Sequence, residues 1–129
     1  MQDISRITQN YEYSDTFFDG LFEMEFWIKN EPNICLHVWE GYFIDIYDNP
    51  PLHGLGWHGF TRDYHEDKGA WASRIYMDEI KNVQEYLTDA LQYKDKKFRF
   101  EETKGFYEVF IQFLQYAVDT SQSIMIDLP

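Results

Sequence analysis

Residues 21–29 alternate between two kinds of side chain, and this period of two constrains the fold more than any other feature. The first set is apolar and comprises Phe22, Met24, Phe26 and Ile28. The second set is mostly charged and comprises Glu23, Glu25, Trp27 and Lys29. Because successive side chains of a strand point to opposite faces of its sheet, the pattern predicts a half-buried strand. Gly20 before it and the Asn-Glu-Pro-Asn run at 30–33 mark its ends.

Two later stretches, 76–92 and about 104–119, carry apolar residues at helical spacing and predict amphipathic helices. Between them, residues 98–101 alternate Phe with charged residues and predict a short strand, and 124–128 alternates again as a last strand. No repeat, low-complexity tract or linker divides the chain. The sequence therefore predicts one α+β domain over residues 1–129, with a small, mainly antiparallel sheet packed by several helices.

Residues 33–48 fit two patterns. As a helix, they carry a continuous apolar stripe formed by Cys35, Val38, Trp39, Tyr42, Phe43 and Ile46. As a hairpin, residues 34–38 alternate, Glu40-Gly41 turns the chain, and 42–47 forms the second strand. The helix is preferred, although Gly41 weakens it. Residues 1–16 are weakly patterned, and Ile4, Ile7 and Tyr11 have a spacing that allows a short helix.

Residues 49–72 predict a loop, because Pro and Gly interrupt every period. A loop of this length in a compact domain is often functional. It holds three of the four histidines, His53, His58 and His65, close to Asp63, Glu66 and Asp67. These residue types bind zinc and similar ions, so a metal-binding protein or a small metal-dependent hydrolase using loop 53–67 is the alternative function. The histidine spacing matches no zinc motif, and no metal or other cofactor is expected.

Nucleophilic catalysis finds no support in the sequence. Cys35 lies in an apolar stretch, where a buried thiol is inert. No serine stands in a nucleophile elbow, and the glycines of 54–59 are not followed by a Walker Gly-Lys-Ser. With 23 acidic residues, some carboxylates always fall close together, so a carboxylate pair carries little information. We therefore expect a binding protein without catalytic residues.

The charge of the chain indicates which partners it suits. Its 23 acidic and 11 basic residues give a formal net charge of −12, which disfavours direct binding of nucleic acid and favours a basic partner. The acidity also fits the simpler interpretation that it only keeps the protein soluble. Loop 49–72 combines acids with large rings, and its predicted partner-binding residues are Trp57, Asp63, Tyr64, Glu66, Asp67 and Trp71. In the alternative interpretation, rings such as Trp57 and Phe60 pack the loop onto the core.

A cytoplasmic location is expected. A lone Cys35 cannot form an internal disulfide, which fits a reducing compartment. The first residues, Met-Gln-Asp-Ile-Ser-Arg, contain no apolar run typical of a signal peptide. No stretch approaches the roughly 20 apolar residues of a membrane span.

Three stretches carry a resemblance to a known class of proteins. They are Gly-Phe-Thr-Arg-Asp-Tyr at 59–64, Glu-Tyr-Leu-Thr-Asp-Ala-Leu at 85–91, and a helix led by Glu-Thr at 102–103 that runs into Ser-Ile-Met-Ile-Asp at 123–127. Over roughly residues 55–128 the chain resembles immunity proteins of bacterial contact-dependent growth inhibition and related polymorphic toxin systems. The resemblance implies a small cytoplasmic protein that binds and blocks a cognate toxin domain, often a nuclease with a basic cleft. It carries over no catalytic residues, so the partner-binding residues remain those of loop 49–72.

Overall fold

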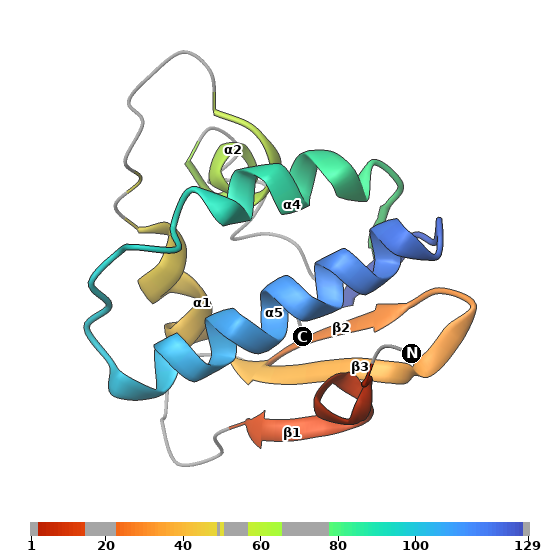
Figure 1. Ribbon diagram of the computed structural model, residues 1–129. Helices are drawn as coiled ribbons and strands as arrows, with labels where there is room; N and C mark the ends of the chain where they lie inside the picture. The colour runs from red at the N-terminus through yellow and green to blue at the C-terminus, as the bar shows by residue number, and fades with distance from the viewer. Residues whose placement is uncertain (1–2, 15–22, 49, 51–56, 66–77, 128–129) are drawn as a thin grey trace.

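The computed structural model describes residues 3–14, 23–48, 50, 57–65 and 78–127 (Figure 1). Within these ranges, five strands form one sheet and four α-helices pack around it. The strands are β1 (Asn10–Tyr13), β2 (Glu23–Ile28), β3 (Glu31–Trp39), β4 (Asp78–Ile80) and β5 (Ile124–Asp127). The helices are α1 (Glu40–Tyr47), α2 (Gly59–His65), α4 (Val83–Leu91) and α5 (Glu101–Asp119), preceded by a 3-10 turn, η1 (Ser5–Ile7). The predicted α+β class with a mainly antiparallel sheet is confirmed.

The strand order is β1-β3-β2-β5-β4, with β1 parallel to β3 and every other pair antiparallel. The predicted strand at 21–29 is confirmed over Glu23–Ile28, and it lies at the centre of the sheet. Phe26 is paired with Leu36 on one side and with Ile126 on the other, and all three side chains are buried. The alternation of side chains along β2 therefore reflects one apolar face of the sheet, which the helices cover.

Helix α5 runs across this apolar face, and α4 lies beside α5 with α2 beyond it (Figure 1). The phenylalanines of α5 pack against the sheet and the other helices in an aromatic core. The ring centroids of Phe26 on β2 and Phe110 on α5 lie 5.2 Å apart there. Phe43 of α1 and Phe60 of α2 join the same cluster, 5.3 Å from each other. The predicted helices at 76–92 and 104–119 are confirmed over Val83–Leu91 and Glu101–Asp119.

Residues 33–48 are neither one helix nor a hairpin. The first half is strand β3, and the chain turns directly into helix α1 at Glu40. Each of the two predictions was right for one half of the segment. The alternation typical of a strand ends at Val38, and the apolar stripe typical of a helix continues from there. A glycine is needed at position 41, because the indole of Trp39 lies against the backbone there. A Cβ atom on Gly41 would collide with that ring. The preference for a single helix was wrong because a periodicity cannot show where one element passes into another.

The strand predicted at 98–101 is absent from the described structure, and the segment leads into α5 instead. Asp45 of α1, which is 1% exposed, accepts hydrogen bonds from the backbone N–H groups of Arg99 at 2.9 Å and Phe100 at 3.0 Å. It also accepts one from the Thr103 hydroxyl at 2.7 Å. Asp45 thus supplies the cap that α5 lacks locally, and it fixes the backbone where a strand was expected.

Two further predictions need correction. The predicted loop 49–72 contains helix α2, and the start of the helix predicted at 76–92 contains strand β4. Near the N-terminus, where the spacing allows a short helix, the described residues form the 3-10 turn η1 and then strand β1. Among the helices described, none has the length and apolar character needed to cross a membrane.

Candidate binding surface

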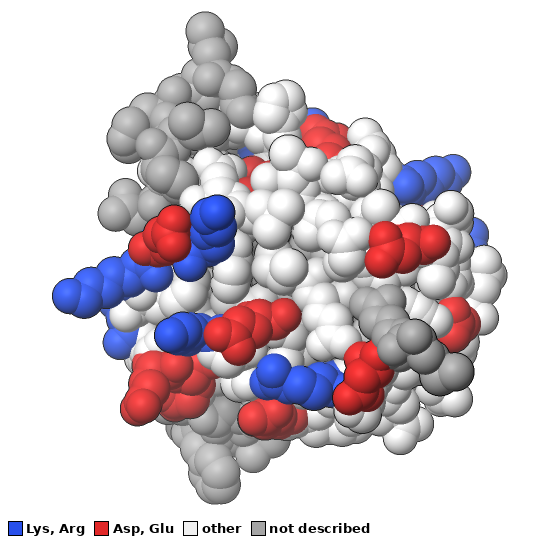
Figure 2. Space-filling model, in the orientation of Figure 1, with Lys and Arg blue, Asp and Glu red and all other residues white. Residues whose placement is uncertain are grey.

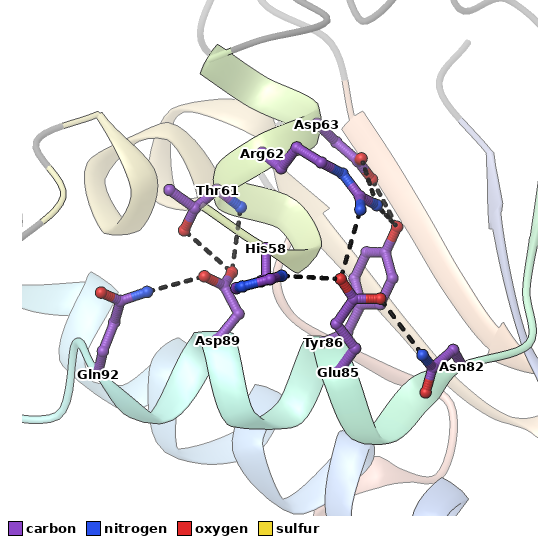
Figure 3. A network of polar contacts seen from close by, with 9 residues as sticks. All are labelled: His58, Thr61, Arg62, Asp63, Asn82, Glu85, Tyr86, Asp89 and Gln92. Carbon is purple, nitrogen blue, oxygen red and sulfur yellow. Dashed lines mark hydrogen bonds and ion pairs between the residues drawn. The ribbon is translucent and has the colours of Figure 1, made fainter. Parts of the chain in front are cut away.

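Helix α2 is held on α4 by a buried carboxylate (Figure 3). Asp89 of α4 is 4% exposed, and its Oδ2 accepts hydrogen bonds from the Thr61 backbone N–H and hydroxyl, both at 3.0 Å. Gln92 donates to the other oxygen at 2.7 Å. Burial raises the pKa of Asp89 above its usual range, although these donors oppose the shift. Gly59 allows the close approach, because its φ of +56° is left-handed and a Cβ there would lie 2.9 Å from that of Asp89.

Asp63 was predicted as an exposed partner contact, and its position does not support that role. It is 7% exposed, and its Oδ2 accepts a hydrogen bond from the Tyr86 hydroxyl at 2.8 Å. Arg62 donates to the second oxygen of Asp63 at 3.4 Å and to Glu85 at 3.3 Å (Figure 3). Burial and the bond to Asp63 raise the pKa of Tyr86 well above its usual range. The carboxylate of Asp63 therefore fastens α2 to α4 and is not presented to solvent.

The other predicted partner contacts are only partly described. Trp57 is half-buried, and its ring lies 5.0 Å from that of His65, so it packs against α2. Tyr64 lies on α2, but its side chain is outside the described structure. Glu66, Asp67 and Trp71 lie outside the described residues altogether. The described part of the loop is thus a packed helix rather than an open acidic patch.

The histidines of the alternative metal site have separate neighbours. His58 is exposed and lies 3.3 Å from Glu85, while the Nε2 of His65 is 2.6 Å from the carbonyl oxygen of Tyr47. His53 lies outside the described residues. Within the described ranges, no group of three or more His, Cys, Asp or Glu side chains is arranged to hold a metal ion.

A second acidic and aromatic surface lies on the face of the sheet opposite the helices. We call it the open sheet face, and it comprises Tyr11, Glu23, Glu25, Trp27, His37, Glu79, Met125 and Asp127. These residues alternate along their strands with the buried core residues. The side chains of Glu23 and Glu25 are 35% and 40% exposed, and Tyr11 is 58% exposed. Carboxylates and rings therefore reach solvent together there.

Neighbouring strands set the open sheet face out in rows. One row pairs His37 with Glu25, and Glu25 with Asp127. The next row pairs Trp27 with Met125, and Met125 with Glu79. The result is one pair of neighbouring carboxylates, Glu25 and Asp127, beside the apolar side chains of Trp27 and Met125.

The ring of His37 organises one end of the open sheet face. It stacks on Tyr11 with the centroids 4.0 Å apart, which holds both rings nearly parallel. Its nitrogens lie 3.6 Å from Glu23 and 3.7 Å from Glu25. At the other end, Lys29 donates to Glu79 at 3.0 Å, and this bond lowers the pKa of Glu79. Both ends of the surface are therefore ordered by local contacts.

Glu25 and Asp127 face each other directly across β2 and β5. Like charges at such positions repel and destabilise the folded state. A Lys or Arg side chain of a partner, placed between the two carboxylates, would relieve that repulsion and gain a charged hydrogen bond. Trp27 beside them supplies the kind of ring that anchors protein interfaces. The arrangement suits a basic protein surface.

The sulfur of Cys35 offers no reactive group to the open sheet face. The residue is 6% exposed, and burial raises the pKa of its thiol above the usual range. Its Sγ lies 4.0 Å from the Nε2 of His37, which is a weak contact. A neutral, buried thiol is a poor nucleophile, as the sequence predicted.

The signal for the open sheet face was present in the sequence. The alternation at 21–29 already placed Glu23, Glu25 and Trp27 on the face away from the core. The missing information was which strands lie beside β2, because that brings Asp127 next to Glu25.

Comparisons with protein-family models, with curated proteins and with solved structures each find no match to this chain.

Proposed function

We propose that this chain is an immunity-type protein that neutralises a basic toxin domain, expected to be a nuclease, by binding it in the cytoplasm. Binding is stoichiometric and non-covalent, and it covers the basic cleft with which the toxin holds its nucleic acid. The open sheet face is the contact surface. Loop 49–72 adds to it only through residues outside the described part, because Asp63 is occupied within the fold.

The observation that carries the proposal is the pair of facing carboxylates on the open sheet face. Glu25 and Asp127 are directly opposite each other, and Trp27 lies next to them on the same strand as Glu25. Acidic residues attract basic surfaces over long range and speed encounter, while an aromatic ring supplies buried apolar area. The net charge of −12 acts in the same direction. The resemblance of residues 55–128 to immunity proteins supports the same class of partner.

The test uses the C-terminal domain encoded by the gene immediately upstream. That domain is expressed in cells alone, with the wild-type chain, and with the variant Glu25→Lys/Asp127→Lys. We expect the domain to kill alone, the wild-type chain to restore survival, and the variant to lose protection. The expected loss follows because two attractive contacts become repulsive.

The matched control is Glu12→Lys/Asp119→Lys, which changes the net charge equally at positions away from the facing pair. This control is expected to protect as well as the wild-type chain. If the domain is harmless, or kills regardless of this chain, the immunity function is wrong. If the wild-type chain protects and both double variants protect equally, the function stands and the open sheet face is not the interface.

A further inference from the structure

Tyr11 has the most exposed large hydrophobic side chain among the described residues, and one face of its ring is already covered. The residue is 58% exposed, compared with 43% for Leu91. Its ring stacks on that of His37, with the centroids 4.0 Å apart and the planes inclined by 14°. Because His37 covers one face, an exposure this large requires that the opposite face be open to solvent. We call that side of the Tyr11 ring the outer ring face.

The imidazole under Tyr11 is itself held in place. The His37 side chain is 15% exposed, and its two ring nitrogens lie 3.6 Å from Glu23 and 3.7 Å from Glu25. Glu23 in turn accepts a hydrogen bond from the Ser14 hydroxyl at 2.6 Å. The ring of Tyr11 therefore rests on a support that is formed before a partner arrives. Little side-chain entropy is lost when a partner covers such a ring.

The charge behind this ring is negative. Glu23 and Glu25 lie at the nitrogens of the stacked imidazole, and Asp127 faces Glu25 across β2 and β5. The side of the molecule that carries α4 and α5 is different, because Lys and Arg side chains lie there among Asp and Glu (Figure 2). A cation at the outer ring face is therefore attracted by the carboxylates beyond it, and the net charge of −12 adds to this attraction.

We propose that the outer ring face of Tyr11 is the point at which the open sheet face takes an arginine side chain of its basic partner. The planar guanidinium lies on the ring in a cation–π contact, while the N–H groups at its edge point towards Glu23 and Glu25. A lysine ammonium is compact and strongly hydrated, so it does not cover the ring and meet a carboxylate in the same way. The inference rests on the proposed function for the identity of the partner, and it adds that arginine is preferred to lysine.

The probes are two fluorescein-labelled peptides of equal length and charge, in which either arginine or lysine alternates with glycine. Fluorescence polarisation measures their binding to the whole chain, and the observable is the ratio of the two dissociation constants, because the net charge attracts both peptides alike. We expect the wild type to prefer the arginine peptide. Tyr11→Phe keeps the ring and should keep the ratio. In Tyr11→Leu, which keeps apolar area without a ring face, the preference should fall by roughly two- to fivefold, the size of an exposed cation–π contact.

The matched control is Phe100→Leu, which removes an exposed ring that packs on Tyr42 of α1 and is not part of the open sheet face. Its ratio should equal that of the wild type. The inference is overturned if the wild type binds neither peptide or both equally, or if Tyr11→Leu keeps the wild-type ratio. It is also overturned if Tyr11→Phe or Phe100→Leu loses the preference as Tyr11→Leu does.

Each variant changes an exposed side chain, so circular dichroism and urea unfolding should show intact folds. The peptide assay contains no toxin, so its failure is distinguishable from failure of the survival test. If the wild-type chain protects cells but the peptide ratio does not depend on the ring of Tyr11, the immunity function stands and the arginine contact is wrong.

Discussion

Replacing Glu25 with Gln should stabilise the folded protein, because it removes one of two carboxylates that face each other across β2 and β5. Directly opposed side chains have Cβ atoms about 5 Å apart. Two charges about 5 Å apart in water repel by about 0.8 kcal/mol, and screening near 0.15 M salt reduces this to about 0.5 kcal/mol. The free energy of unfolding should rise by up to that amount, because the same change also removes the charge that lies 3.7 Å from a nitrogen of His37.

Urea unfolding followed by circular dichroism measures this change. With a slope of about 1–3 kcal/mol/M, the midpoint should rise by roughly 0.2–0.5 M while the slope stays unchanged. In about 1 M salt, where screening acts over about 3 Å, most of the gain should disappear. The control Glu12→Gln removes one charge from an exposed position of β1, so it reports the general effect of lowering the net charge.

A double-mutant cycle isolates the pair itself. Glu25→Gln and Asp127→Asn should each stabilise, and the double variant should gain less than the sum, because either change alone removes the repulsion. A coupling of zero, or a loss of stability in Glu25→Gln beyond that of Glu12→Gln, would refute the reasoning. The same variants should bind the toxin domain more weakly, since stability and binding compete at this pair.

Three other changes test the framework that supports the surfaces. Asp45→Ala should lower the free energy of unfolding by about 2–4 kcal/mol in urea titrations, because it leaves the buried hydroxyl of Thr103 and two backbone N–H groups without their acceptor. Gly59→Ala should cost about 1–2 kcal/mol in the same assay, since its φ is +56° and the new Cβ meets Asp89. For Asp89 itself, the raised pKa means that the native state takes up a proton before the unfolded state does as the pH falls. The free energy of unfolding of the wild type, relative to that of Asp89→Asn, should therefore increase as the pH falls from 7 towards the ordinary pKa range of a carboxyl group. If unfolding measured at several pH values in that range shows no such increase, the reasoning is wrong.

The sequence was sufficient to predict the helices and strands that have a strong periodicity. It was not sufficient for the elements whose structure depends on contacts with residues distant in the chain. The alternation at 21–29 and the apolar stripe of 104–119 were sufficient for β2 and α5. Helix α2 was missed because its seven residues contain no full apolar stripe. What holds it in place is Asp89, which is 28 positions from Thr61. A local pattern carries no information about such a partner.

The burial of Asp63, one of the predicted partner contacts, was missed for a related reason. Acidic and aromatic residues were sought in the loop, where exposure is the rule, yet Asp63 is buried against Tyr86, 23 positions away. The alternating strand had already shown Glu25 and Trp27 on the solvent side. Their meaning depends on strand order, which brings Asp127 of the last strand beside Glu25. Strand order is set by long-range packing, so the surface emerges only from the fold.

The most direct test of the central claim is a calorimetric titration of the purified toxin domain with this chain. We predict a one-to-one complex whose affinity falls with salt and is weakened roughly a hundredfold by Glu25→Lys/Asp127→Lys, while Glu12→Lys/Asp119→Lys leaves it within about twofold. Tight binding that is indifferent to both pairs of changes would contradict the assignment of the open sheet face. No binding at all would contradict the proposed function.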